Sequence, residues 1–448
     1  MDASIPNGLT VLAALRPGAE EPLRQVLRAI GDDIKGKTLG GPAGRPHIDF
    51  PRSRTVHFAR FAILDDPDRG PDRKRLLFSS NYDGELDSHL AELIRITSDM
   101  DAIWGGCEAY AGVTAFPAFI RAHAHEPLAF YIAFRDGSVE WIQRAISIRR
   151  QTQALLETAP ATALARLVTE APADRPWMGI VRGIADAARW SIDALRRLVR
   201  AAPVVVDFVR AVVQLGFADV FRGTNRIIAS LDRYPIFRVA NRITSNRMPA
   251  RKWPYSSVTI DTRAAFEPLA PGDEVPSILR GGTPPAFRED VVTQNQLTLL
   301  TVVQPQSVNR VKAVMSAIDA YAKRLAPPGS LIGISTIHFV RWLLIDEGRR
   351  LMLVSDYDGS WESYIDEFAE MILSGLDAIW ETSFGFPPDG AQDLPALKRF
   401  LRSHQVPSEV FFSAYPDATV LNVAADLALA GAWTEAIGSG PGNLLQRL

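Results

Sequence analysis

The chain has few of the residues that mark disulfide-rich, metal-rich or membrane-spanning proteins. Its 448 residues include one cysteine, Cys107, so an intramolecular disulfide and any site that needs several thiolates are excluded. This cysteine content fits a reducing compartment, and we expect a cytoplasmic protein. No run of eighteen apolar residues lacks a charge, and the first residues carry no signal-peptide pattern. We therefore expect neither a simple membrane span nor secretion.

The chain also lacks an excess of charge of one sign. Lys and Arg number 49 against 51 Asp and Glu, a net charge of −2. A nucleic-acid-binding protein usually has a basic excess, so we expect no nucleic-acid partner. The motifs His-Glu-Xaa-Xaa-His, Gly-Xaa-Ser-Xaa-Gly and Gly-Xaa-Gly-Xaa-Xaa-Gly are missing, which disfavours zincin, α/β-hydrolase and Rossmann chemistry.

What the sequence does contain is an internal repeat. The matching segments follow one another in the same order along the chain, which indicates a duplicated unit. In chain order they are Leu9–Leu12 with Leu297–Leu300, Val56–Arg60 with Ile337–Arg341, Tyr82–Gly84 with Tyr357–Gly359, Asp101–Trp104 with Asp377–Trp380, and Phe119–His123 with Phe400–His404. Trp104 and Trp380 are expected to anchor the core of each copy.

The hydrophobic periodicity of each copy predicts the order β-α-β-β-α-β. Apolar runs predict strands, and apolar residues at helical spacing predict helices. In the first copy, the strands are expected at 9–15, 55–64, 75–80 and 128–134, and the helices at 21–30 and 86–96. This is the order of the ferredoxin-like α+β fold. The predicted domains are a first repeat at 1–150, a helical insertion and linker at 151–285, and a second repeat at 286–448.

The insertion is strongly basic in one part. Between Arg175 and Lys252 there are fifteen basic and five acidic residues, a net charge of +10 (15 − 5). Such a segment suits an anionic membrane surface or a protein partner. Residues 204–221 are apolar around most of a helical circumference. This pattern predicts burial within the protein or an oligomer, or contact with lipid, so a homo-oligomer is left open.

Two such repeats in one chain resemble the dimeric α+β barrel superfamily, which includes dye-decolourising peroxidases and chlorite-dismutase-like haem proteins. The resemblance rests on element order, duplication and the segment Ser80–Gly84, matched by Ser355–Gly359. Dye-decolourising peroxidases carry Gly-Xaa-Xaa-Asp-Gly, whose Asp acts with an Arg on the distal side of haem. Here Ser stands in place of the first Gly. The resemblance implies an intrachain barrel that binds haem.

Under this resemblance, two pairs of side chains are candidate catalytic residues. Asp83 or Asp358 would shuttle a proton, and Arg60 or Arg341 would stabilise developing charge. The residues themselves allow another interpretation, because Asp followed by Gly before a helical pattern is typical of a turn and a helix N-cap. In that case the arginines neutralise the aspartates across a hairpin.

The histidines are candidate cofactor ligands. His125 or His123 would be the axial haem ligand, because the second histidine of His-Ala-His occurs in the first copy alone. His57, His338 and His404 are further candidates. The alternatives are structural: strand alternation places His57 and Arg60 on opposite faces, and His123 belongs to a polar loop before the last strand.

Three functional hypotheses follow. The first is a haem-dependent, peroxidase-like oxidoreductase that acts on a small organic or lipid substrate. The second is a non-catalytic scaffold or membrane-peripheral protein that docks through its basic insertion, at the inner face of a membrane or on a partner. The third is a cofactor-free enzyme that uses the barrel pocket.

Overall fold

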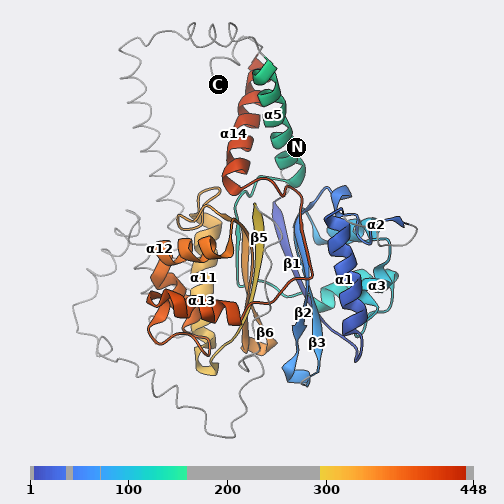
Figure 1. Ribbon diagram of the computed structural model, residues 1–448, viewed down its shortest axis with the longest axis vertical. Helices are drawn as coiled ribbons and strands as arrows, with labels where there is room; N and C mark the ends of the chain where they lie inside the picture. Colours follow the sequence, from blue (N-terminus) through green and yellow to red (C-terminus); the bar gives the residue numbers. More distant parts are fainter. Residues whose placement is uncertain (1–4, 37–43, 71, 159–292, 440–448) are drawn as a thin grey trace, which may run out of the picture.

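The computed structural model describes residues 5–36, 44–70, 72–158 and 293–439. These residues form an α+β structure in which two four-stranded antiparallel sheets face each other, as Figure 1 shows. This confirms the predicted α+β class and is compatible with the ferredoxin-like type. The predicted segment 175–252 and the apolar segment 204–221 lie outside the described residues.

The first sheet has the strand order β1-β3-β2-β8 and the second has the order β4-β6-β7-β5. The strands of the first sheet are β1 (Pro6–Ala14), β2 (Val56–Asp65), β3 (Lys74–Asp83) and β8 (Val410–Ser413). Those of the second are β4 (Ala129–Ile132), β5 (Gln294–Val302), β6 (Ile337–Ile345) and β7 (Arg350–Asp358). All four predicted strands of the first copy are present.

The two halves of the chain exchange their last strands. β4 follows the N-terminal half but pairs with β6, and β8 follows the C-terminal half but pairs with β2. The segments that lead into β4 and β8 each bond to the first strand of their own half before they reach the other sheet. The amide of His125 donates to Thr10 O, and that of Val406 donates to Thr298 O, both at 2.8 Å. The exchanged strands provide hydrogen-bond partners for backbone N–H and C=O groups of β2 and β6. Without these strands, the groups would lie unpaired at the edge of each sheet.

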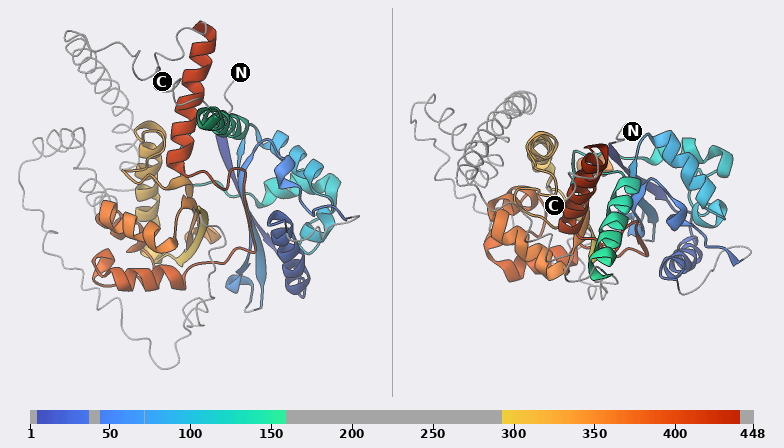
Figure 2. Two further views of the ribbon diagram at one scale, coloured as in Figure 1. Left: turned by 45° about the horizontal axis from the view of Figure 1, so that its top comes forward. Right: turned by 90° about the horizontal axis from the view of Figure 1, so that it is seen from above.

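Helices cover the outer face of each sheet, and two more project from one end (Figures 1 and 2). The first sheet carries α1 (Glu20–Ile34), α2 (Leu86–Ile96), α3 (Met100–Trp104) and α4 (Phe116–His123). The second carries α11 (Val308–Arg324), α12 (Trp361–Trp380) and α13 (Leu394–Ser403). The projecting helices are α5 (Val139–Thr158) and α14 (Val420–Ser439). Short 3₁₀ turns are η2 (Phe50–Arg52), η3 (Pro67–Arg69), η4 (Val113–Ala115), η6 (Pro305–Ser307), η7 (Asp346–Gly348) and η8 (Gly390–Gln392).

Apolar side chains fill both outer layers and part of the space between the sheets. In the first outer layer, Leu23, Leu27 and Ile30 of α1 are buried against the sheet at helical spacing. Trp104 and Trp380 are buried in their respective layers, as predicted. The cluster between the sheets joins residues of both halves, among them Leu12 and Leu343.

Two features differ from the sequence-based prediction. Residues 116–123 form helix α4, whereas a polar loop was expected, because Phe116, Phe119 and Ile120 bury one face of a short helix. The predicted boundary at residue 150 falls inside α5. In the described part of the chain, no helix is both long and apolar enough to cross a membrane.

The strand exchange predicts that the halves stay together after the chain is cut. If a protease site is placed within residues 159–292 and cleaved, we expect both fragments to elute together at the volume of the uncut protein. The reason is that β4 and β8 each lie in the sheet of the opposite half. Size-exclusion chromatography with and without denaturant measures this. Separate elution of the fragments without denaturant would contradict the exchange.

Candidate functional site

A buried centre at the start of β2 joins His57, Asp83 and Tyr415. A β-bulge between Val56 and Phe58 interrupts the side-chain alternation of β2. The Nε2 atom of His57 lies 2.9 Å from Oδ1 of Asp83, and Nδ1 lies 2.9 Å from the Tyr415 hydroxyl. Since a carboxylate only accepts, Nε2 is the donor in the bond to Asp83. His57 is completely buried.

The C-terminal half contains a matching centre. His338 Nε2 lies 2.8 Å from Oδ1 of Asp358. The side-chain amide of Gln294 lies 3.3 Å from the same nitrogen and donates to the carbonyl oxygens of Tyr415 and Ala418. Both histidines therefore have a carboxylate partner, but the remaining neighbours of the two rings differ.

The second oxygen of each carboxylate binds the start of a projecting helix. Oδ2 of Asp83 accepts from the amide of Val139 at 2.8 Å, and Oδ2 of Asp358 accepts from that of Val420 at 2.7 Å. These are the first residues of α5 and α14. A carboxylate at this position satisfies a free helix amide and interacts favourably with the helix dipole.

The predicted N-cap role was thus placed on the wrong helices. The helix after Asp83 begins beyond Glu85, without a side-chain cap, and the helix after Asp358 is capped by the Ser360 hydroxyl. Gly84 and Gly359 have φ values of 82° and 80°, and these left-handed turns lead the chain away from the aspartates. The aspartates bind helices that lie far along the chain.

Arg60 crosses the space between the sheets. Its guanidinium donates to Leu297 O at 3.0 Å and Ser355 O at 2.9 Å, and forms an ion pair with Asp356. The ring centroid of His57 also lies 5.2 Å from that of Phe339 on β6 of the opposite sheet. Arg60 and His57 therefore both point between the sheets, and the prediction that they point to opposite sides is wrong. The bulge in β2 accounts for the difference. Arg60 and Asp83 form no pair.

Arg341 crosses in the opposite direction but has no carboxylate in direct contact. Its Nη2 donates to Ser79 Oγ at 2.9 Å, Ser80 O at 3.1 Å and Asn81 Oδ1 at 3.0 Å. Its Nη1 is buried and has no hydrogen-bond partner within the described residues. The expected neutralisation of Asp358 by Arg341 is therefore also wrong, because the two side chains bind different parts of the interior.

Asp356 influences both arginines, but among the described residues it forms an ion pair with Arg60 and none with Arg341. Asn81 occupies the position that matches Asp356, and its side-chain amide donates to Asp356 Oδ2 at 2.7 Å. Burial lowers the pKa of Arg60, against the effect of Asp356, and lowers that of Arg341 to about 9. A Cβ at Gly8 would collide with Nη1 of Arg341, so a larger residue at this position would displace the guanidinium group.

The remaining candidate histidines lie apart from these centres. His123 ends α4, with Nδ1 2.8 Å from Phe119 O, and His404 has the same contact with Phe400 O at 2.8 Å. His125 is partly buried, and this burial lowers its pKa, with Asp346 and Arg75 close enough to modify it. The structure does not bring these side chains to Asp83 or Asp358.

Two buried histidines, His47 and His89, were missed by the sequence analysis. His89 of α2 stacks on Tyr82, with ring centroids 3.9 Å apart, and its Nε2 lies 2.9 Å from Ser80 Oγ. Burial lowers its pKa to about 3. Its position three residues after Leu86 and one before Leu90, on the apolar face of the predicted helix, was the available signal. Tyr364 makes the matching stack on Tyr357 in the other half.

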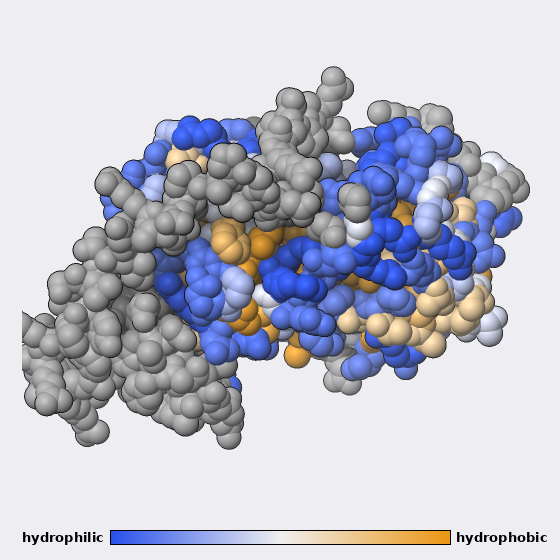
Figure 3. All heavy atoms as spheres, turned by 90° about the horizontal axis from the view of Figure 1, so that it is seen from below, coloured by the Kyte–Doolittle hydropathy of each residue, from blue (hydrophilic) through white to orange (hydrophobic). Residues whose placement is uncertain are grey.

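Charged residues of both halves meet at the end of the sheets opposite α5 and α14. Arg75 holds Asp346 through two bonds of 2.7 and 3.0 Å, and Arg350 binds Asp68 at 2.9 Å. A cavity of about 420 Å³ lies there, lined by His123 and mainly by charged residues. Figure 3, seen from this end, shows largely hydrophilic residues with smaller apolar patches.

The described residues do not fit a haem group. An axial ligand needs an open imidazole nitrogen, and the macrocycle needs a largely apolar cavity. Both nitrogens of His57 have partners, Nε2 of His338 faces Asp358, and the cavity beside His123 has charged walls. Nε2 of His404 has no hydrogen-bond partner among the described residues, but this histidine is buried and lines neither that cavity nor the groove beside η2. We therefore derive no chemistry through haem. Within the same residues, no group of three or more His, Cys, Asp or Glu could hold a metal ion.

A phosphate-loop consensus also occurs, at residues 31–38, Gly-Asp-Asp-Ile-Lys-Gly-Lys-Thr. A working phosphate loop follows a strand and opens a helix. Here the consensus begins inside α1, which ends at Ile34. Lys37 and Thr38 lie outside the described residues. The structural context therefore does not support a phosphate loop.

The chain matches no protein-family model, no curated protein and no solved structure.

The Asp83 contacts predict a local loss of stability when the carboxylate is removed. Asp83→Ala leaves Nε2 of His57 and the Val139 amide without a partner, so we expect the free energy of unfolding to fall by about 2 to 4 kcal/mol. Amides of the first turn of α5 should exchange faster with solvent, and those of α14 should not. Asp87→Ala is the control, because the Asp87 side chain is 78% exposed. Equal effects of the two substitutions on stability and exchange would contradict the role of Asp83.

The buried His89 predicts a pH dependence of stability. Its pKa is about 3 in the fold and about 6.5 in an unfolded chain. The unfolded state therefore binds the proton first as pH falls, and stability is lost below about 6.5 by up to about 1.4 kcal/mol per pH unit. His89→Phe keeps a ring on Tyr82 and should flatten this dependence between pH 6 and 4, as measured by urea unfolding. Tyr364→Phe should leave the slope unchanged, and an unchanged slope in His89→Phe would disprove the assignment.

Proposed function

We propose that the protein is a non-catalytic scaffold. Its folded body holds α5 and α14 as a helix pair and docks on an anionic membrane surface through the basic insertion between the two halves. The observation that carries this proposal is that both candidate catalytic carboxylates, Asp83 and Asp358, are fully engaged as anchors of these helices.

An acid–base catalyst must reach a substrate. Asp83 and Asp358 are both buried, and neither lines the charged cavity beside His123 or the groove beside η2. Arg60 and Arg341 are likewise buried between the sheets, where they bind backbone carbonyls of the opposite half. The residues to which the resemblance gives peroxide chemistry thus have a sufficient role in holding the fold together.

We further propose that the two sheets form one duplicated ferredoxin-like barrel. The exchanged strands β4 and β8 support this arrangement, since each connects to both sheets. The matching His–Asp centres support it as well, because they occupy corresponding strand positions in the two halves. In such a barrel, both projecting helices start at the same end of the sheets, where their first amides bind Asp83 and Asp358.

The helix pair is linked to the body and to the insertion. Arg149 of α5 binds Asp426 of α14 through Nε at 2.7 Å, and Gln143 donates to Ala414 O at 3.0 Å. Figure 2 shows the two helices side by side. The chain leaves the described structure at the end of α5, at residue 158. The insertion therefore begins from a position that Asp83 and α14 hold in place.

The scaffold proposal predicts a protein without a haem spectrum. Hemin titration should give no saturable Soret shift, because His57 and His338 have other partners, the cavity beside His123 has charged walls, and the buried His404 lines neither this cavity nor the groove beside η2. Visible absorption of the purified protein, before and after titration, measures this. A sharp shift that saturates at about one haem per chain would overturn the scaffold proposal in favour of an oxidoreductase with a small organic or lipid substrate.

The docking proposal predicts salt-sensitive binding to anionic vesicles. The protein should float with vesicles that contain phosphatidylserine and not with pure phosphatidylcholine, since the +10 of residues 175–252 is attracted to anionic lipid. Binding should weaken in high salt and be lost when 175–252 is deleted. Circular dichroism checks that the shortened protein folds. Binding that is absent, or that survives the deletion, would contradict docking through the insertion.

A further inference from the structure

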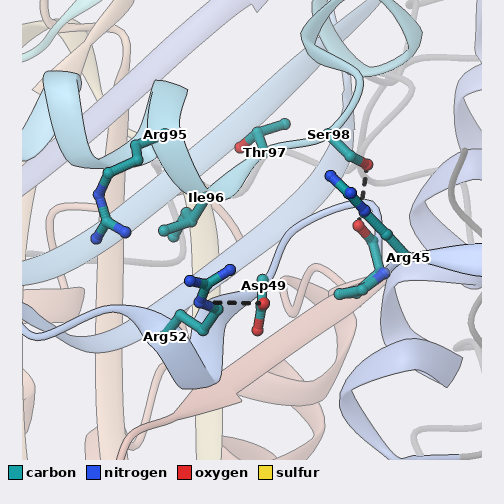
Figure 4. A pocket seen from close by; sticks show the side chains of 8 residues that line it. Arg45, Asp49, Arg52, Arg95, Ile96, Thr97 and Ser98 are labelled. Atoms are coloured by element: carbon teal, nitrogen blue, oxygen red, sulfur yellow. Dashed lines mark hydrogen bonds and ion pairs between the residues drawn. The ribbon is translucent and has the colours of Figure 1, made fainter.

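A groove of about 700 Å³ lies between η2 and the C-terminal end of α2, away from the His–Asp centres. Figure 4 shows the side chains around it. Its lining includes Arg45, Asp49, Arg52, Arg95, Ile96 and Ser98. Neither the internal repeat nor the proposed scaffold function accounts for this groove.

The wall of the groove is held in a fixed shape. The amide of Asp49 donates to Ile96 O at 2.8 Å, and that of Ser98 donates to His47 O at 2.8 Å. The hydroxyl of Ser98 donates to Pro46 O at 2.9 Å. These bonds attach the segment before η2 to the end of α2. The positions from which the arginines project are therefore set by the fold, which reduces the entropy cost of binding.

The charge around the groove is unbalanced. Three guanidinium groups face one lining carboxylate, that of Asp49, which lies 3.8 Å from Nε of Arg52. Arg95 contacts Glu92 at 3.3 Å, but Glu92 also accepts hydrogen bonds from Ser53 and Thr55. Like charges around one hollow repel each other, and an anion placed between them removes this repulsion.

We propose that this groove binds a phosphomonoester. Guanidinium groups bind phosphate oxygens through paired, charge-assisted hydrogen bonds, so Arg45, Arg52 and Arg95 would hold the phosphate. Pro46 and the edge of Ile96 would contact the organic part. The phosphate can belong to a soluble metabolite or to a lipid headgroup, because the recognition chemistry is the same. The proposal does not depend on the basic insertion.

Isothermal titration calorimetry with phenyl phosphate and with inorganic phosphate tests the soluble form. The full-length protein should bind phenyl phosphate at one saturable site. The groove variant Arg45→Gln/Arg52→Gln/Arg95→Gln should bind at least tenfold more weakly. The control variant Arg28→Gln/Arg121→Gln/Arg144→Gln removes the same charge from exposed arginines elsewhere and should bind within twofold of the natural protein. Thermal unfolding checks that both variants fold.

Vesicle binding distinguishes the two sources of phosphate. Phosphatidylcholine vesicles that contain either phosphatidic acid, a phosphomonoester, or phosphatidylglycerol, a phosphodiester, are compared at the same surface charge with the same three proteins, because the basic insertion would bind both anionic surfaces alike. Saturable binding of phenyl phosphate that the groove variant loses assigns a soluble ligand. Tighter binding to phosphatidic acid than to phosphatidylglycerol vesicles without binding of phenyl phosphate, with this preference lost in the groove variant alone, assigns a lipid headgroup. No binding of phenyl phosphate and no preference for phosphatidic acid, or an equal loss in the control variant, overturns the proposal.

Discussion

A carboxylate can leave water only when other groups replace its hydration, and at Asp83 and Asp358 these groups come from distant parts of the chain. Each carboxylate meets a histidine of the second strand of its half and the first amide of a projecting helix. If either partner were displaced, a buried charge would lose its compensation. The directions of α5 and α14 are therefore coupled to the strands from which the body is built, and the proposed scaffold role depends on this coupling.

The space between the sheets contains a second set of buried charged groups, in which two arginines lie near one carboxylate, that of Asp356. Arg60 has a direct carboxylate partner, whereas Arg341 has Asn81 and hydroxyl and carbonyl oxygens. The guanidinium carbon of Arg341 also lies 5.4 Å from the ring centre of Phe130, within reach of a cation–π interaction. The interior is thus asymmetric although the two halves share matching sequence segments. Each arginine binds the opposite half, which opposes separation of the sheets.

The predictable part of this structure is the part that local patterns encode. Apolar periodicity gave the helix at 86–96 and the strands, and Trp104 and Trp380 were correctly placed in the core. The partners of β4 and β8 were not predictable, because an apolar strand fits either sheet edge. The same holds for Asp83, whose helix partner is 56 residues away, and for His57, whose orientation depends on a bulge that alternation does not reveal.

A distance measurement tests most directly whether the two carboxylates, Asp83 and Asp358, fix the helix pair α5 and α14. Cys107 is buried and is the only cysteine. The substitutions Ser147→Cys in α5 and Ala428→Cys in α14, both at exposed positions, therefore allow thiol-reactive spin labels to be attached selectively. Electron–electron resonance should give one narrow distance distribution in the otherwise natural protein and a broad one after Asp83→Ala/Asp358→Ala. A broad distribution before the substitutions, or a narrow and unchanged one after them, would contradict the claim.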